Sequence, residues 1–274
     1  MLNVILTKPR VETSGSQKLL HALIAALAER DDARVITTPH LYDLAPDGPS
    51  MDVLRGETGE LIVGAWLNPR AAFWTLDANG IRGRMGRSLL LPDEELEDDT
   101  ADKAGRTIWC FDLRRHSKPQ PLLGEIDRIL RVHGTGPIAP LAKPIADAAT
   151  GNGHRELAES TRSRWYPVID RARCTGCLEC LNFCLFGVYG IDRQGRLFVE
   201  NPDACKDGCP ACSRVCPRGA VMFPGHANPT IAGEIHPGPR QTDPDLLQLG
   251  GSPPPPNDDD NLDHLVDGVD DAEL

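Results

Sequence analysis

The sequence has no long hydrophobic run, and this absence bears on where the protein resides. No stretch of the 274 residues approaches the roughly 20 consecutive apolar residues that a transmembrane helix needs. The apolar run within the first residues, MLNVILTKPR, is too brief for a secretory signal peptide. We therefore expect no membrane span and a cytoplasmic protein in a reducing compartment.

Signatures of nucleotide and nucleic acid binding are also absent. No G-x-G-x-x-G follows the first apolar run, and no G-x-x-x-x-G-K-[ST] occurs anywhere. The basic residues are scattered and the formal net charge is −11, which argues against binding to a phosphate backbone. Residues 258–274 contribute much of this acidity, with eight Asp or Glu and no Lys or Arg.

Cysteine, in contrast, is abundant and clustered. Of the nine cysteines, eight fall into two runs, which are Cys174, Cys177, Cys180, Cys184 and Cys205, Cys209, Cys212, Cys216. The first run reads C-x2-C-x2-C-x3-C, a spacing in which three sulfurs bind one iron–sulfur cluster and the fourth binds a second. Two such runs predict two clusters.

Two alternatives to iron remain open for these cysteines. Closely spaced cysteine pairs also form structural zinc sites, although those pairs are usually separated by a longer stretch. Disulfides are the weaker alternative, because dense disulfide frameworks belong to short secreted chains. The ninth cysteine, Cys110, lies in an apolar stretch and is expected to be a buried core thiol.

The two runs resemble the bacterial-type ferredoxin domain with two [4Fe-4S] clusters, over roughly residues 161–224. The resemblance implies that each cluster takes three ligands from one run and its fourth from the other. Cluster 1 is then expected to bind Cys174, Cys177, Cys180 and Cys216, and cluster 2 to bind Cys205, Cys209, Cys212 and Cys184. The second run has one residue more than the simplest pattern between its first two cysteines, and we expect Gly208 to accommodate it.

The residues between the cysteines predict a small α+β domain. Tyr166–Asp170, Val188–Asp192 and Leu197–Glu200 alternate as strands of two hairpins do, and a helical turn is expected after each cysteine triplet. The apolar side chains expected to surround the clusters are Leu178, Leu181, Phe183, Phe186, Val188, Tyr189, Val215 and Val221. So small a domain has little core of its own, and we expect it to unfold without iron.

Residues 1–132 alternate apolar runs with amphipathic stretches. Strands are expected at 2–7, 34–38, 60–67 and 106–113, and helices at 16–30, 68–79 and 121–132. Nearly continuous apolar strands that alternate with helices favour a parallel sheet covered on both faces. The expected fold class is therefore α/β, a small three-layer sandwich with a mainly parallel sheet of about four strands.

Ligands in such sheets bind beyond the carboxyl ends of the strands. The residues that follow the expected strands form a basic rim, made of Lys8, Arg10, His40, Asn68, Arg70, Arg114, Arg115 and His116. This rim could receive an anionic cofactor, a substrate carboxylate or an acidic partner. The competing interpretation is that Ser14 or Ser16 caps the first helix and the arginines are surface charges. No catalytic residue can be assigned.

Residues 133–160 are expected to be a linker, with possible helices at 142–149 and 154–162. Residues 225–274 are expected to be a Pro-rich and acidic tail, largely disordered. The sequence thus predicts an electron-transfer protein with a redox partner, in which the α/β domain recognises that partner or a ligand. The alternative is an oxidoreductase, or its subunit, in which the clusters supply electrons to a substrate or flavin at the α/β domain.

Overall fold

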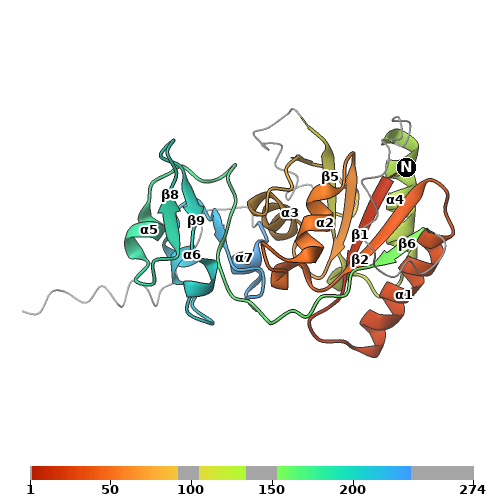
Figure 1. Cartoon of the computed structure of the whole chain (residues 1–274), viewed down its shortest axis with the longest axis horizontal. Helices are drawn as coiled ribbons and strands as arrows, with labels where there is room; N and C mark the ends of the chain where they lie inside the picture. Colours follow the sequence, from red (N-terminus) through yellow and green to blue (C-terminus); the bar gives the residue numbers. More distant parts are fainter. Residues whose placement is uncertain (1, 92–104, 134–152, 236–274) are drawn as a thin grey trace, which may run out of the picture. The chain divides into compact units, whose positions relative to one another are not determined.

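A parallel sheet organises the N-terminal part of the chain (Figure 1). The computed structural model describes residues 2–91, 105–133 and 153–235. The strands of this sheet are β1 (Leu2–Thr7), β2 (Ala33–Thr38), β3 (Leu61–Ala65), β4 (Arg84–Met85), β5 (Thr107–Asp112) and β6 (His154–Glu156). They are ordered β4-β5-β3-β1-β2-β6, and every pairing between neighbours is parallel.

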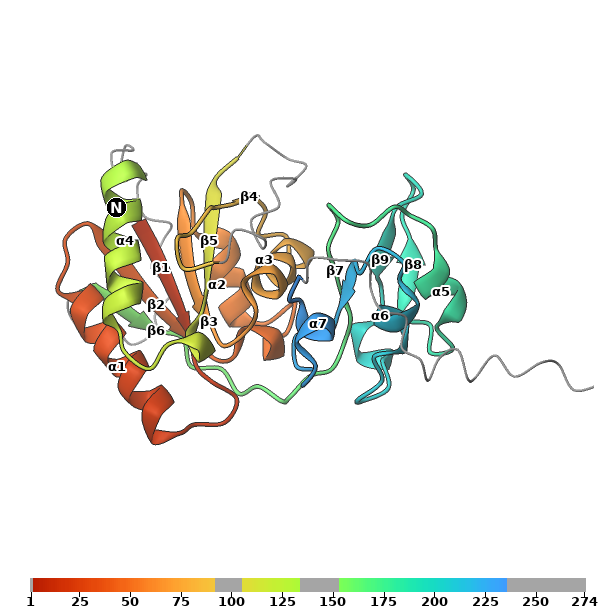
Figure 2. The same ribbon diagram turned by 180° about the vertical axis from the view of Figure 1, so that it is seen from behind.

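Helices cover both faces of the sheet (Figure 2). Helices α1 (Ser14–Ala28) and α4 (Gln120–His133) bury their apolar stripes in one core, while α2 (Pro49–Gly56) and α3 (Pro69–Ala78) contribute to the other. Strands β1, β3 and β5 are buried along their whole length, because each has a helical layer on either side. The predicted three-layer α/β sandwich is confirmed.

Two strands of the sheet were not predicted. Strand β4 is only two residues long, and β6 is the polar tripeptide His154-Arg155-Glu156 at the sheet edge. Neither carries the apolar run by which buried strands are recognised, since an edge strand has a neighbour on one side alone. The helix predicted at 154–162 is wrong, because β6 begins there and no helix follows; residues 142–149 lie outside the described residues.

The cysteine-rich region contains two small antiparallel sheets. Strands β8 (Tyr189–Ile191) and β9 (Leu197–Val199) form the hairpin that was predicted. The second predicted hairpin is wrong, because β7 (Val168–Ile169) pairs with the distant β10 (Val221–Met222). This pairing closes the region around its cysteines, since β7 precedes the first run and β10 follows the second.

Three short helices complete the region: α5 (Glu179–Phe183), α6 (Ala211–Val215) and α7 (Pro229–Ala232). Helices α5 and α6 each carry the third cysteine of a run. Helix α7 belongs to residues expected to lie in the tail, yet Ile231 and Ala232 are buried. The tail beyond residue 235 lies outside the described residues.

The cysteine-rich region packs on the α2 and α3 side of the sheet. Val168 of β7 and Met222 of β10 share one buried core with Phe73 of α3.

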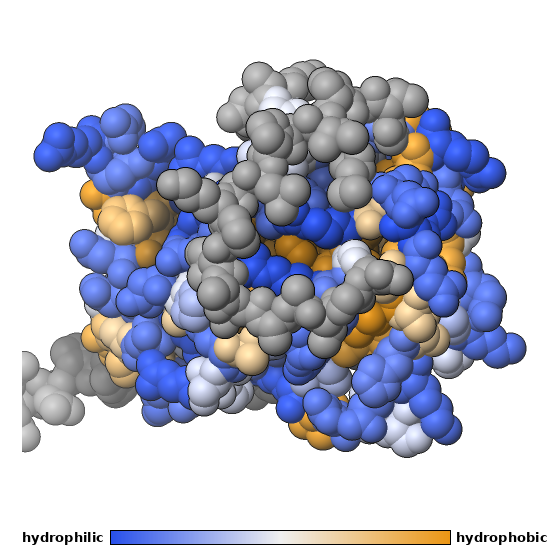
Figure 3. All heavy atoms as spheres, turned by 45° about the vertical axis from the view of Figure 1, so that its right-hand side comes forward, coloured by the Kyte–Doolittle hydropathy of each residue, from blue (hydrophilic) through white to orange (hydrophobic). Residues whose placement is uncertain are grey.

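Within the described ranges, no helix is both long and apolar enough to cross a bilayer. In the space-filling view, hydrophobic side chains appear in small groups on a mostly hydrophilic face (Figure 3).

Candidate metal centre

The first cysteine run folds into a tight loop that ends in α5. Leu178, between Cys177 and Cys180, has a φ of 64° and is the single non-glycine residue with positive φ in the described ranges. A side chain in this conformation costs roughly 1–2 kcal/mol. Such strain is typical of functional sites, and the leucine itself gave no sequence signal for it. The Leu178 carbonyl accepts hydrogen bonds from the N–H groups of Leu181 and Asn182, which starts α5.

The second run uses glycine for its turn. Gly208 has a φ of +73°, the left-handed conformation that glycine adopts without steric cost. The turn is closed by the N–H of Cys209, which donates to the Lys206 carbonyl at 3.0 Å. Gly208 therefore accommodates the extra residue, as expected.

Four cysteines line one hollow of about 310 Å³, a volume that includes the space open to solvent at its mouth. They are Cys174, Cys177, Cys180 and Cys216. Three come from the first run and the fourth from the end of the second. Leu197 and Val221 add apolar walls, and Arg218 brings a positive charge. Four thiols with apolar walls are the donor set that a [4Fe-4S] cluster requires.

Cys184 and the first three cysteines of the second run influence one another's protonation. Burial, together with the nearby Cys209 and Cys184 thiols, raises the pKa of the Cys205 thiol to about 12. Burial likewise raises the pKa of Cys212 to about 12, with Cys205, Cys184 and Cys209 acting in the same direction. Cys184, although it belongs to the first run, therefore lies within electrostatic reach of Cys205 and Cys212 of the second run.

The high pKa values determine the state of the metal-free thiols. Burial raises the pKa of Cys180 to about 12, and Cys216, Cys212 and Cys174 add to the effect. Such thiols stay protonated at neutral pH, so binding of iron must displace their protons.

In the part of the chain that the structure describes, no three His, Cys, Asp or Glu side chains converge on the position of a single metal ion.

The apolar surroundings follow the prediction in part. Val188, Tyr189 and Val221 are buried, and Leu178, Leu181 and Val215 are half-buried. Phe183 and Phe186 were predicted wrongly, since they are 50% and 43% exposed. Helix α5 has only five residues, so burying Cys180 leaves the residues at its C-terminal end facing solvent.

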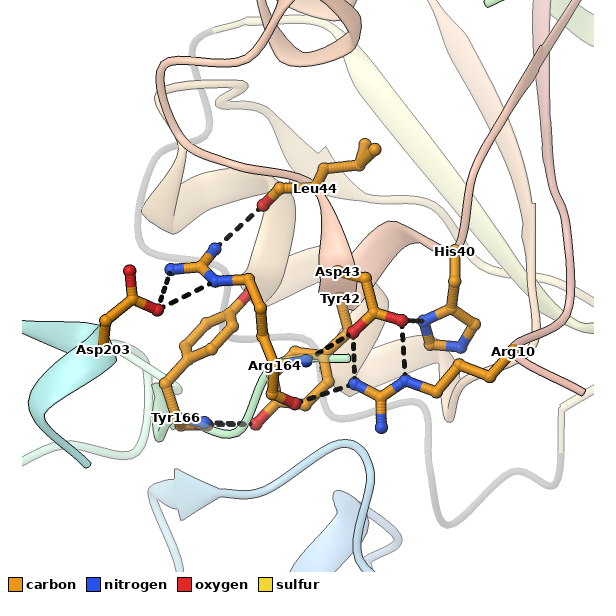
Figure 4. Close-up of polar contacts among 8 residues, drawn as sticks. All are labelled: Arg10, His40, Tyr42, Asp43, Leu44, Arg164, Tyr166 and Asp203. Carbon is orange, nitrogen blue, oxygen red and sulfur yellow. Dashed lines mark hydrogen bonds and ion pairs between the residues drawn. The ribbon is translucent and has the colours of Figure 1, made fainter. Parts of the chain in front are cut away.

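The basic rim does not present the open anion site that the strand ends suggested. Arg10 donates to both carboxylate oxygens of Asp43, and it also donates to the Arg164 carbonyl at 2.8 Å (Figure 4). Arg164 in turn reaches the Leu44 carbonyl and the carboxylate of Asp203, which lies two residues before Cys205. Arg10 thus contributes to the joint between the sheet and the cysteine-rich region.

The other charged residues of the rim also face acidic groups of the chain. The pairs are Lys8 with Glu156, Arg70 with Asp170, Arg114 with Asp112, and Arg115 with Asp112 and Glu234. His40 lies beside Asp43, and burial lowers its pKa to about 4. Asn68 is the N-cap of α3, where its side chain accepts the N–H of Arg70 at 2.9 Å. His116 is half-buried, and this burial lowers its pKa. The rim therefore serves the internal structure.

The loop before α1 is a helix cap. The Thr13 side chain accepts the N–H of Ser16, and the Ser16 hydroxyl accepts the N–H of Thr13. This reciprocal pair is a capping box. A helix cap was expected at Ser14 or Ser16; the cap residue is instead Thr13, and Ser16 closes the box.

Cys110 lies apart from the other cysteines, in the middle of β5. It is buried, and burial raises the pKa of its thiol well above the usual range. A thiol in such surroundings is unreactive. Cys110 is therefore a core residue, as predicted.

Comparisons with known proteins point to iron–sulfur chemistry. A stretch of 66 residues is 41% identical to an uncharacterised ferredoxin of Methanocaldococcus jannaschii, which covers 24% of this chain and 44% of that protein. Over this stretch the chain is similar to a ferredoxin. A stretch of 57 residues is 37% identical to the indolepyruvate oxidoreductase subunit IorA of Methanothermobacter marburgensis, covering 21% of this chain and 9% of that subunit.

No family model matches the sequence. The chain spans less than half the length of the ferredoxin and about a tenth of the oxidoreductase subunit. The similarities support an iron–sulfur site within the matched stretch.

Proposed function

We propose that this protein transfers electrons through two [4Fe-4S] clusters. Cluster 1 is bound by Cys174, Cys177, Cys180 and Cys216, and cluster 2 by Cys205, Cys209, Cys212 and Cys184. The observation that carries the proposal is the shared hollow, because Cys216 lines it together with the first three cysteines of the other run. When bound, each cluster supplies the ability to accept and release one electron.

Groups around the sulfurs would stabilise the reduced cluster, which carries one more negative charge than the oxidised cluster. The Ala220 N–H donates to the Cys216 sulfur at 3.3 Å, and such a bond stabilises the more negative, reduced state. Arg218, at the wall of the hollow, acts in the same direction through its positive charge. Leu197 and Val221 keep water away from part of the site.

Exposed apolar side chains favour the cluster 2 end as the place of electron exchange with a partner. Phe183, Leu185, Phe186 and Ile191 are 43% to 91% exposed, and the first three flank Cys184 in the sequence. A redox partner that covers such residues would bring its own cofactor close to this ligand. In this proposal the protein recognises a redox partner and transfers electrons to it, and it makes or breaks no covalent bond itself.

A second candidate function is that of a subunit in a larger oxidoreductase. The similarity to the indolepyruvate oxidoreductase subunit favours this candidate. In that case the clusters would pass electrons to a substrate or flavin held by the assembly. The paired state of the basic rim makes the α/β domain itself a poor place for an anionic ligand.

Redox cycling of the purified protein tests the proposal and separates the candidates. A carrier is expected to be reduced by dithionite and reoxidised by an artificial acceptor over many cycles without loss of iron. It should show no flavin absorption band and turn over no small molecule without an added partner. A flavin band, or turnover by the protein alone, would instead establish an enzyme. Loss of iron at the first cycle would contradict both candidates.

A further inference from the structure

Arg70 connects the α/β domain to the loop that carries Cys174. It lies at the start of α3, and its side chain is buried. Its Nε donates to Asp170, which is buried as well, and its Nη1 donates to the Gly233 carbonyl at 3.3 Å. A buried ion pair across two structural regions costs desolvation, so its geometry must be well fixed to persist.

Asp170 organises the backbone in front of the first ligand. Its Oδ1 accepts the N–H groups of Ala172 and Arg173 at 3.0 and 3.2 Å. Its own carbonyl accepts the N–H of Cys174 at 3.0 Å. The orientation of the Asp170 carboxylate therefore determines where the Cys174 loop begins.

The same guanidinium reaches the fourth ligand of cluster 1. The Nη2 of Arg70 donates to the Gly219 carbonyl at 2.8 Å. That carbonyl belongs to the peptide group whose N–H, on Ala220, donates to the Cys216 sulfur at 3.3 Å. The Ala220 carbonyl accepts the N–H of Asp170 at 2.8 Å, which closes a ring of contacts.

We propose that Arg70 is a positioning residue for cluster 1, through which the α/β domain sets the reduction potential of that cluster. This inference rests on the proposed function, in which Cys174 and Cys216 bind cluster 1. Because Arg70 polarises and orients the Gly219–Ala220 peptide, it strengthens the hydrogen bond to the Cys216 sulfur. Its positive charge also balances Asp170, whose carboxylate would otherwise oppose reduction of a nearby cluster.

The charge and the fork of the guanidinium can be separated by substitution. Arg70→Gln removes the charge and most of the contacts, and leaves the Asp170 carboxylate without this partner. Arg70→Lys keeps the charge but cannot reach Asp170 and the Gly219 carbonyl with a planar fork. Arg10→Gln is the matched control, because Arg10 also spans the two regions yet contacts Asp43 and Arg164 instead of the cluster 1 loops.

Redox titration followed by EPR on the anaerobic full-length protein tests the inference. Cluster 1 is identified as the component that disappears in Cys174→Ala. In Arg70→Gln, the ratio of reduced to oxidised cluster 1 at a fixed potential should fall about tenfold, equal to 59 mV for a one-electron couple. Arg70→Lys should give a smaller fall, and Arg10→Gln should leave cluster 1 unchanged.

The outcomes separate this inference from the proposed function. Titration curves of cluster 1 that coincide in wild type and both Arg70 variants would overturn it, as would an equal fall in Arg10→Gln. If Arg70→Gln does not fold, Arg70→Lys decides alone. A wild-type protein without [4Fe-4S] signals would instead refute the proposed function.

Discussion

The carboxylate of Asp43 accepts a hydrogen bond from the backbone N–H of Arg164 at 2.9 Å, and so joins the sheet to the segment that leads into the cysteine-rich region. Asp43 is buried and also receives the Arg10 guanidinium. We predict that Asp43→Ala lowers the free energy of unfolding by about 2–3 kcal/mol, since it leaves a partly buried arginine without this carboxylate.

Anaerobic urea unfolding followed by tryptophan fluorescence checks this prediction. Asp52→Ala is the control, because Asp52 is exposed and forms a surface pair with Arg55. That substitution should cost less than about 1 kcal/mol. Equal losses in the two variants would mean that the Asp43 joint contributes nothing beyond an ordinary surface ion pair.

Crossed ligation makes a second prediction. Cys216→Ala should remove the same EPR component as Cys174→Ala, and Cys184→Ala the same component as Cys205→Ala. The reason is that the last cysteine of each run binds the cluster formed mainly by the other run. Iron in each variant should fall to about half of the wild-type amount. Pairing of Cys216→Ala with Cys205→Ala would show that each run binds its own cluster.

His40 makes the stability of the fold depend on pH. It is buried beside Asp43, and burial lowers its pKa to about 4 while Asp43 opposes this shift. The folded state therefore binds fewer protons than the unfolded state between about pH 6.5 and pH 4, and stability falls as the pH decreases through this range. The loss from His40 is about 1 kcal/mol at pH 5.5 relative to pH 7.5.

Thermal unfolding at these two pH values, in wild type and His40→Asn, measures the effect. The variant should show a smaller loss of stability on acidification, because asparagine does not titrate. Burial also lowers the pKa of His154 and of His226. Both side chains are less buried than that of His40, so each is expected to contribute less to the pH dependence. An unchanged pH dependence in His40→Asn would assign the acid sensitivity to other groups.

Cys110 should be dispensable for metal binding. It is buried in β5 within the core of the sheet, so Cys110→Ala is expected to destabilise the fold by about 1 kcal/mol through a small cavity. Iron and sulfide contents should equal those of the wild type. A loss of iron in this variant, at unchanged secondary structure, would make Cys110 part of the metal centre.

The sequence predicted those parts of the structure that depend on repeated local patterns. The strands near Leu2–Thr7, Leu61–Ala65 and Thr107–Asp112 are apolar because both faces are covered, and their chemistry reveals them without tertiary information. The polar edge strand β6 and the pairing of β7 with β10 were missed. Both depend on which distant segment lies alongside, and two or three residues carry no such signal.

For the candidate site, the cysteine spacing identified the sulfur ligands. The basic residues at the strand ends, however, wrongly suggested an open anion site. Arg10 and Arg70 follow strands, as ligand-binding residues do, yet they pair with Asp43 and Asp170. Asp170 is a hundred residues from Arg70 in the chain, so no local pattern couples them. The left-handed Leu178 also escaped prediction, because tertiary constraints impose that conformation.

The central claim is that the two cysteine runs bind two [4Fe-4S] clusters, and counting their components tests it most directly. Anaerobically purified protein should contain about eight iron and about eight acid-labile sulfide per chain, with EPR signals of reduced [4Fe-4S] clusters after dithionite. A colourless protein that contains zinc and no labile sulfide would contradict the account.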